Sequence, residues 1–354
     1  MNASRLEEIL GKIASVAVAV IGDFCVDRYL HLDPSIRDDS RETGLPIHQV
    51  VGTRSLPGGA ASVLANLAAL GVGRVVPVGI IGEDGSGFEL AAALGALGVD
   101  TSRLQRSRSR TTPTYIKPVV TREDGLLDEL SRYDVFPREP LAAEAEQSLL
   151  EAVRDELDRC GALIISDYGE AGKSGLISPA VRAGLLNLAR ERPEKVFFAD
   201  SRLRVGDFPD CCIKPNALEA SALLGGSLTE DSPIYELGAA ARGLTARTRR
   251  PVFLTLGERG LIAASGEKVH HVPGFRLGEP IDPVGAGDAV TASVTAALAA
   301  GAEVPEAGLF GVLAASITVG KLGECGTAAP EEMRARGVEY ARVHPDSSGG
   351  DTPR

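Results

Sequence analysis

The feature that most constrains the fold of this chain is its alternation of short apolar runs with Ala- and Leu-rich helical stretches. Apolar runs predict buried strands at 16–22, 162–166, 195–200 and 251–256. Helical periodicity predicts helices at 4–14, 59–70, 86–97, 140–157, 176–190, 233–247, 286–299 and 305–321. Strands that are apolar throughout are buried on both faces, so the alternation predicts a doubly wound α/β fold with a mostly parallel sheet. Ligands of such sheets bind at the carboxyl ends of the strands.

Two segments, at about 29–53 and 111–134, interrupt this alternation. They contain Thr, Tyr, Val and Pro with weak alternation and no helical period. They predict a small β lid inserted in the main domain, and the alternative is two ordinary surface loops. The polar tail 341–354 is rich in Gly, Pro and Ser, which predicts disorder. The expected organisation is therefore one α/β domain over 1–340, with a lid.

Composition excludes several classes of function. The chain has 37 Lys and Arg against 48 Asp and Glu, a net charge of −11, which argues against nucleic-acid binding and against docking on an anionic membrane. The apolar run 16–21 is too short to span a bilayer. The five cysteines are odd in number and lack CxxC spacing, which favours a reducing, cytoplasmic location over a disulfide framework or a zinc site.

A loop of small residues, Gly285-Ala286-Gly287-Asp288, opens directly into a long Ala-rich helix. Small residues let a ligand approach the backbone, and the free amides at a helix N-terminus attract anions. The carboxylate of Asp288 would repel a phosphate unless it accepts a proton from a hydroxyl during phosphoryl transfer. The alternative is that Asp288 caps the helix beside a tight turn, and the spacing alone does not separate the two.

The segment DPVGAGD (282–288) resembles the C-terminal signature of the PfkB, or ribokinase-like, carbohydrate kinases. Further matches follow in family order: IGDFCVDRY (21–29), PGGAASVLANLAALG (57–71), VGIIGEDGSG (78–87), SDYG (166–169), KPNALEA (214–220) and TLGERG (255–260). Within the family, the strings ETGLPI (42–47), SRYD (131–134) and VGKLG (319–323) are similar to the kinase half of the bacterial D-glycero-D-manno-heptose 7-phosphate kinases. One departure is Ser62, which stands where the N-terminal signature normally carries Asn.

The resemblance implies roles for particular residues. Asp288 would be the catalytic base, and the amides of Gly285, Ala286 and Gly287 would form the anion hole for the γ-phosphoryl group. The residues expected to bind the acceptor are Asp27, Gly58, Gly59, Asn66 and Arg132. Carboxylates accept hydrogen bonds from sugar hydroxyls, and paired glycines let a ring lie against the backbone. The alternative for Asp27 is a loop cap after the first strand.

The resemblance also implies ATP and Mg²⁺ as cofactors. Thr255, Gly257 and Gly260 would border the nucleotide. Asn216 and Glu219 match the family's N-x-x-E, in which the carboxylate organises Mg²⁺ and its waters, although the same spacing is typical of a helix capping box. In relatives, a site comparable to Asp282 helps to bind a monovalent cation such as K⁺. The basic candidates for contact with a phosphate already on the substrate are Arg28, Arg41, Arg132, Lys173 and Arg202.

The predicted function is ATP-dependent phosphorylation of a hydroxyl on a sugar or sugar phosphate. One candidate acceptor is D-glycero-D-manno-heptose 7-phosphate, at its anomeric hydroxyl. The alternatives are a nucleoside kinase of the same fold and a non-catalytic protein that binds sugar or nucleotide. Relatives often pair through their lids, so a homodimer is expected by analogy.

Overall fold

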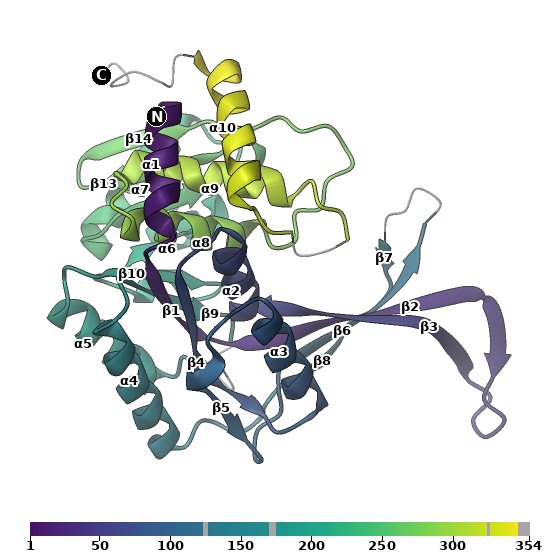
Figure 1. Cartoon of the computed structure of the whole chain (residues 1–354). Coiled ribbons are helices and arrows are strands. Elements are labelled where there is room, and N and C mark those ends of the chain that lie inside the picture. The colour runs from purple at the N-terminus through teal and green to yellow at the C-terminus, as the bar shows by residue number, and fades with distance from the viewer. Residues whose placement is uncertain (123–126, 170–174, 324–325, 346–354) are drawn as a thin grey trace.

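The computed structural model describes residues 1–122, 127–169, 175–323 and 326–345, and these form a helix-covered sheet with a long projecting arm (Figure 1). In this part of the chain the main sheet has nine strands. Their spatial order is β14 (Lys268–Val272), β13 (Leu261–Ser265), β12 (Val252–Thr255), β11 (Cys212–Ile213), β10 (Val196–Ser201), β9 (Ala162–Asp167), β1 (Ala17–Gly22), β4 (Arg74–Gly82) and β5 (Leu104–Ser107). The strands from β12 to β5 are parallel, and β13 and β14 are added antiparallel. The predicted α/β fold with a mostly parallel sheet is confirmed.

Helices cover both faces of this sheet because its strands are apolar on both sides. One face carries α1 (Ala3–Ile13), α2 (Ala60–Ala69), α3 (Gly85–Ala96), α8 (Ala286–Ala299), α9 (Val304–Thr318) and α10 (Pro330–Val343). The other carries α4 (Ala143–Leu157), α5 (Pro179–Glu191), α6 (Ala217–Leu224) and α7 (Ile234–Thr248). In β1 the residues alternate between the two cores: Val18 and Val20 join the first, and Ala19 and Ile21 join the second. Burying both faces of one strand in this way is typical of a doubly wound sheet.

A second, smaller sheet grows from the carboxyl edge of the main sheet. Its strands are β2 (Phe24–Asp39), β3 (Pro46–Gly59), β6 (Thr114–Thr121), β7 (Leu127–Glu129) and β8 (Tyr133–Val135). β2 and β3 form the long hairpin that projects from the molecule in Figure 1. The bounds 29–53 predicted for the first part of the lid were too narrow. β2 starts at Phe24, just after β1, and its pairing with β3 reaches Gly59, next to α2. Residues 123–126 of the expected lid lie outside the described residues.

The C-terminal helix requires a correction to the predicted tail. The tail was predicted to begin at residue 341, but α10 continues to Val343, so residues 341–343 are helical. Tertiary packing extends the helix: the Tyr340 ring lies 5.5 Å from that of Phe275, and the His344 Nε2 lies 3.0 Å from the Gly274 carbonyl oxygen. Residues 346–354 lie outside the described part of the chain.

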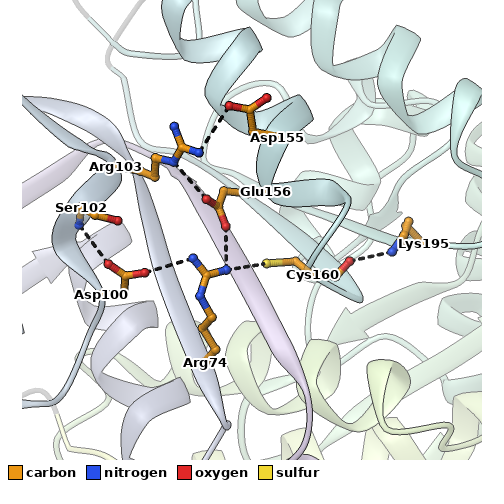
Figure 2. Close-up of polar contacts among 8 residues, drawn as sticks. All are labelled: Arg74, Asp100, Ser102, Arg103, Asp155, Glu156, Cys160 and Lys195. Carbon is orange, nitrogen blue, oxygen red and sulfur yellow. Dashed lines mark hydrogen bonds and ion pairs between the residues drawn. The ribbon is translucent and has the colours of Figure 1, made fainter.

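At the amino edge of the sheet, a polar cluster ties β4 to α4 (Figure 2). The buried carboxylate of Glu156 accepts hydrogen bonds from Arg74 at 2.6 Å and from Arg103 at 3.0 Å. Arg74 also donates to Asp100. This cluster lies at the starts of β1 and β4, at the opposite edge from the carboxyl ends of the strands. No helix among the described residues is long and apolar enough to cross a membrane.

Candidate active site

A cavity of about 310 Å³ lies at the carboxyl edge of the main sheet, where the second sheet faces it. One wall comes from the second sheet and the start of α2: Asp27, Gly59, Ser62, Tyr115, Lys117 and Arg132. The other wall comes from the strand ends and from α6 and α8: Tyr168, Asp200, Arg202, Lys214, Glu219, Val284, Gly285, Gly287 and Asp288. The cavity thus brings together eight of the residues proposed from sequence, which are Asp27, Gly59, Arg132, Arg202, Glu219, Gly285, Gly287 and Asp288.

Asp288 lies in the first turn of α8, with its carboxylate in the cavity wall. Its Oδ1 accepts a hydrogen bond of 2.5 Å from the hydroxyl of Tyr168. The pKa of Asp288 is raised to about 6: burial and the nearby charge of Asp200 raise it, and they outweigh the Tyr168 and Ser62 hydroxyls and Lys214, which lower it. A carboxylate with such a pKa is ionised at neutral pH and still accepts a proton readily, as a general base requires.

The loop before Asp288 presents backbone amides to the same cavity. Gly285 adopts a left-handed conformation, with φ of 81°, and α8 begins at the next residue. Gly285 and Gly287 line the cavity, and neither amide donates to an acceptor among the described residues. Ala286 differs from the sequence expectation: it does not line the cavity, and its amide already donates to the Pro283 carbonyl at 3.2 Å because the loop turns there. Two of the three expected residues therefore line the cavity and have backbone amides without an acceptor among the described residues.

Lys214 adds a positive charge beside this loop. A Cβ atom placed on Gly287 would lie 3.4 Å from the Lys214 Nζ, so the ammonium group sits against the loop backbone. Burial disfavours the ammonium charge, but Asp200, Glu219 and Asp288 outweigh this effect and raise the pKa of Lys214. Lys214 therefore stays charged, and together with the free amides it makes this end of the cavity suited to an anion.

Glu219 lies in the first turn of α6, where it forms the capping box that the sequence left open. Its Oε2 accepts from the Asn216 amide at 2.9 Å, and the Asn216 side chain accepts from the Glu219 amide at 2.8 Å. The carboxylate nevertheless lines the cavity, and burial raises its pKa. Asn216 does not line the cavity and acts in the structure as the cap of α6.

The opposite end of the cavity is built by β2, β3 and β6. Asp27 is buried, and its Oδ1 lies 3.4 Å from the Lys117 Nζ. Gly58 leaves room for this carboxylate, because a Cβ there would lie 3.0 Å from the Asp27 Cγ. Gly59 has φ of 56°, and a Cβ would come within 2.6 Å of the Asp23 carbonyl oxygen. Gly59 is therefore required for the close approach of the chain at this wall, and a side chain at Gly58 would crowd the Asp27 carboxylate.

Two arginines flank this end of the cavity. Arg132 donates two hydrogen bonds to Asp134, at 2.7 and 2.8 Å, and its guanidinium lies 4.8 Å from the centre of the Tyr115 ring. Arg202 is exposed and lies 5.6 Å from the centre of the Tyr168 ring. No carboxylate among the described residues forms an ion pair with Arg202. Arg202 is therefore the arginine of the cavity whose charge is available to a ligand.

Several sequence candidates lie outside the cavity wall. Asn66 is buried in α2, where its amide donates to the Ser62 carbonyl at 3.0 Å. Arg28 pairs with Glu89 at 2.7 Å, Arg41 lies exposed between β2 and β3, and Lys173 lies outside the described residues. Thr255 ends β12 and bridges to Asn216, and Gly257 and Gly260 form the turn that follows. These last three residues lie at the same edge of the sheet, next to the Lys214 loop.

Asp282 links the loop that carries Gly285 and Gly287, here called the anion loop, to the segment after α9. Its Oδ1 accepts from the Val284 amide at 3.0 Å, and its Oδ2 accepts from the Gly323 amide at 3.1 Å. These bonds fix the start of the loop that carries Gly285 and Gly287.

Sequence reasoning did not assign roles to Tyr115, Lys117, Tyr168, Asp200 or Lys214. Three of them had a detectable signal: Asp200 ends an apolar run, Tyr168 is in SDYG, and Lys214 opens KPNALEA. Tyr115 and Lys117 alternate along β6 in a segment with no motif, and only their pairing beside β2 brings them to the site.

Solved structures with the same arrangement define the class of fold. The chain superposes on a ribokinase from Arabidopsis thaliana, complexed with ribose and ATP, with a TM-score of 0.67, 20% identity and coverage of 92% of this chain and 98% of that chain. It also superposes on phosphofructokinase-2 from Escherichia coli, in complex with substrates and products, with a TM-score of 0.69, 20% identity and coverage of 93% and 99%. These likenesses establish a ribokinase-like fold.

Sequence relatives carry the comparison further. The chain is 37% identical over 325 residues to the bifunctional protein HldE of Pseudomonas paraeruginosa, covering 90% of this chain and 63% of that protein. It is 30% identical over 320 residues to the bifunctional protein HldE of Mesorhizobium japonicum, covering 90% and 61%. The chain thus spans less than two thirds of the length of these relatives. Residues 202–331 match the pfkB family of carbohydrate kinases. This part of the chain therefore carries the sequence features of the pfkB carbohydrate kinases.

Proposed function

We propose that this protein is an ATP- and Mg²⁺-dependent kinase that phosphorylates a hydroxyl of a sugar phosphate, with D-glycero-D-manno-heptose 7-phosphate, at its anomeric hydroxyl, as the candidate acceptor. The observation that carries the proposal is the placement of Asp288 in one cavity with the Gly285 and Gly287 loop, Lys214 and Asp27. A base, an anion-binding loop and a hydroxyl-binding carboxylate are the parts that phosphoryl transfer to a sugar requires. The match to the pfkB family supports the same reaction.

Each end of the cavity has its own task in this mechanism. Asp27 accepts hydrogen bonds from acceptor hydroxyls, and Gly58 and Gly59 let the sugar lie against β3. Asp288 takes the proton from the attacking hydroxyl. The amides of Gly285 and Gly287 and the ammonium of Lys214 stabilise the charge on the phosphoryl group as it moves. The second sheet covers the cavity and reduces access of water, which limits wasteful hydrolysis.

The carboxylates of the cavity fit a magnesium ion that is held mainly through water and phosphate oxygens. Bound Mg²⁺ would neutralise charge on the ATP phosphates. Glu219 keeps one carboxylate oxygen free of the capping box, and Asp200 lies on the same wall. The described residues contain no group of three His, Cys, Asp or Glu side chains that could hold a metal ion, so the site suits a metal that arrives with the nucleotide. A K⁺ ion would use Asp282, whose oxygens each retain a lone pair.

Two basic side chains support an acceptor that already carries a phosphate. Arg202 has no ion-pair partner among the described residues, and Lys117 lies across the cavity beside Asp27. Arginine binds phosphate with two parallel hydrogen bonds. Arg202→Met should raise the KM for a sugar phosphate about tenfold and leave the KM for the corresponding free sugar unchanged. An equal effect on both acceptors would contradict this role.

The reaction is tested by measuring ADP formation with ATP and Mg²⁺ over a panel of sugars, sugar phosphates and nucleosides. We expect turnover stimulated by a sugar or sugar phosphate, and a loss of about 10²- to 10⁴-fold in kcat for Asp288→Asn. Asp158→Asn is the matched control, because this exposed residue at the end of α4 forms an ion pair with Arg192 and does not line the cavity. A panel without any stimulated turnover would refute the proposal. Stimulation by nucleosides alone would assign a nucleoside kinase of the same fold.

The proposal includes a homodimer formed through the long β2–β3 hairpin, which makes up the first part of the predicted lid. Large apolar side chains are exposed along this hairpin, namely Ile36, Leu45, Ile47, Val50 and Val51. An exposed apolar strand pair is costly in water and favours pairing with a second copy. Sedimentation analysis should give a dimer that Val51→Lys converts to a monomer, and a monomeric wild-type protein would overturn this part of the proposal. A cytoplasmic location, where ATP is supplied, also belongs to the proposal.

A further inference from the structure

Tyr168 reaches the candidate base from the end of β9, on the same wall of the cavity. It follows β9 directly, and its hydroxyl donates to the Asp288 Oδ1 at 2.5 Å. Its own backbone is fixed, because the Tyr168 amide donates to the Asp23 Oδ2 at 3.2 Å. The contact with Asp288 therefore joins two elements 120 residues apart in the sequence.

The ring of Tyr168 is held on several sides. A Cβ atom on Gly59 would lie 3.6 Å from the Tyr168 Cδ2, so the ring packs against the backbone at the start of α2. The Arg202 guanidinium lies 5.6 Å from the ring centre. Tyr168 also lines a second, smaller cavity with Asp23, Cys25 and Tyr115. A ring fixed in this way keeps its hydroxyl at one point.

In the contact with the ionised carboxylate of Asp288, the Tyr168 hydroxyl is the hydrogen-bond donor. Burial raises the pKa of Tyr168 well above its ordinary value, and the carboxylates of Asp200 and Asp288 raise it further, so the phenol stays protonated at neutral pH. Its hydrogen bond is directed at one carboxylate oxygen and stabilises the ionised form of Asp288. Among the described residues, Asp200 of β10 disfavours the ionised form of Asp288, and Lys214 after β11 and the Ser62 hydroxyl favour it together with Tyr168. Cys25 of β2 also lies within the electrostatic reach of Asp288. The other charged residues that line the cavity are Asp27, Lys117, Arg132, Arg202 and Glu219.

We propose that Tyr168 is a positioning residue for the base: it binds the Oδ1 of Asp288 and so directs the Oδ2 at the acceptor hydroxyl. This inference rests on the proposed role of Asp288. Removing the phenol oxygen leaves the ring packing and frees the carboxylate to rotate. It also removes one of the interactions that keep the carboxylate ionised.

The test is the pH dependence of kcat and kcat/KM for Tyr168→Phe. We expect kcat at pH 7 to fall about ten- to a hundredfold, the acid limb of kcat/KM to move up by about one pH unit, and the KM for ATP to stay unchanged. Tyr235→Phe is the matched control, because this exposed phenol also donates to a carboxylate, that of Glu236, on α7 outside the cavity wall. A Tyr168→Phe enzyme with the wild-type kcat and acid limb would overturn the inference.

Two further measurements distinguish a packing role of Tyr168 from a positioning role, and an error in this inference from an error in the proposed base. Tyr168→Leu removes the ring as well; if Leu is damaging while Phe matches the wild type, Tyr168 acts only by packing and the inference is wrong. In the ligand-free protein, ¹³C NMR of labelled aspartate, with the Asp288 signal assigned by its loss in Asp288→Asn, should show the Asp288 titration at higher pH in Tyr168→Phe. An unshifted titration would also refute the inference. If Asp288→Asn retains turnover, the proposed base fails instead.

Discussion

The ammonium Nζ of Lys214 lies 3.3 Å from the Oδ2 of Asp200, in the wall of the candidate active site. Asp200 is the next-to-last residue of β10 and also accepts a hydrogen bond of 2.7 Å from Thr291, which lies one turn after Asp288 on α8. The pair therefore connects the sheet edge, the helix that bears the base and the cation beside the anion loop. Both side chains are nearly buried, so each neutralises a charge that would otherwise be costly.

Lys214→Met should separate the catalytic role of this pair from its structural role. Loss of the cation should lower kcat/KM for ATP about a hundredfold, and the unpaired Asp200 should lower the free energy of unfolding by about 2–3 kcal/mol. Steady-state kinetics and urea unfolding measure the two effects. In the control, Lys214→Met with Asp200→Asn, we expect stability to recover and activity to stay low. Full activity of Lys214→Met would contradict the proposed phosphate contact.

The free energy of unfolding should depend on pH, because ionising the buried carboxylate of Asp288 destabilises the folded state. Its folded pKa is about 6, above the ordinary 3.8, so ionisation is less favourable in the folded state. This cost is absent below about pH 4 and complete above about pH 6, where it reaches about 3 kcal/mol. Asp288→Asn should therefore raise the free energy of unfolding at pH 8 and have little effect at pH 4. Urea unfolding at both pH values measures this, and an inactive Asn variant that is less stable at pH 8 would exclude the effect.

The buried carboxylate of Glu156 should stabilise the fold without affecting the reaction (Figure 2). Burial would raise its pKa, but hydrogen bonds from Arg74 and Arg103 outweigh this and lower the pKa. Its contribution is thus present above the ordinary pKa and is lost as the pH falls through the lowered value. Glu156→Gln should cost about 2–3 kcal/mol at pH 7, with an unchanged kcat. Glu151→Gln, an exposed change on the same helix, should stay within about 0.5 kcal/mol, and an equal loss in both variants would contradict the prediction.

Gly59 should tolerate no side chain. Its φ is 56°, and a Cβ would lie 2.6 Å from the Asp23 carbonyl oxygen and 2.7 Å from the Cys25 Sγ. Gly59→Ala should lower the free energy of unfolding by about 2–3 kcal/mol and raise the KM of the acceptor, because the wall beside Asp27 must move. Gly11→Ala is the contrasting change: nothing lies within 4 Å of a Cβ at this position in the last turn of α1, and helix propensity should add about 0.5–1 kcal/mol. Thermal unfolding compares the two, and equal shifts would refute the argument.

The sequence predicted some residues of the candidate site and missed others, because a sequence motif reports only on residues that are adjacent in the chain. The motif before α8 marked Gly285, Gly287 and Asp288, because a helix start and its amides are properties of adjacent residues. The same reasoning placed Ala286 in the anion hole, although the turn directs its amide to Pro283. Lys117 was not detected, since its position depends on β6 pairing with β2, almost 90 residues away in the sequence.

The resemblance to the PfkB signature suggested Asp288 as the base. By itself, the sequence determined the doubly wound fold and the edge of the sheet at which ligands are expected. These follow from hydrophobic periodicity and from the residues at strand ends, both of which are local. Only the tertiary structure decided that Tyr168 donates to Asp288, that Lys214 pairs with Asp200 beside the anion loop, and that Arg202 remains available to a ligand. These relationships depend on the distances and burial created when separate strands and helices pack together, and burial sets both the pKa of a carboxylate and the strength of its contacts.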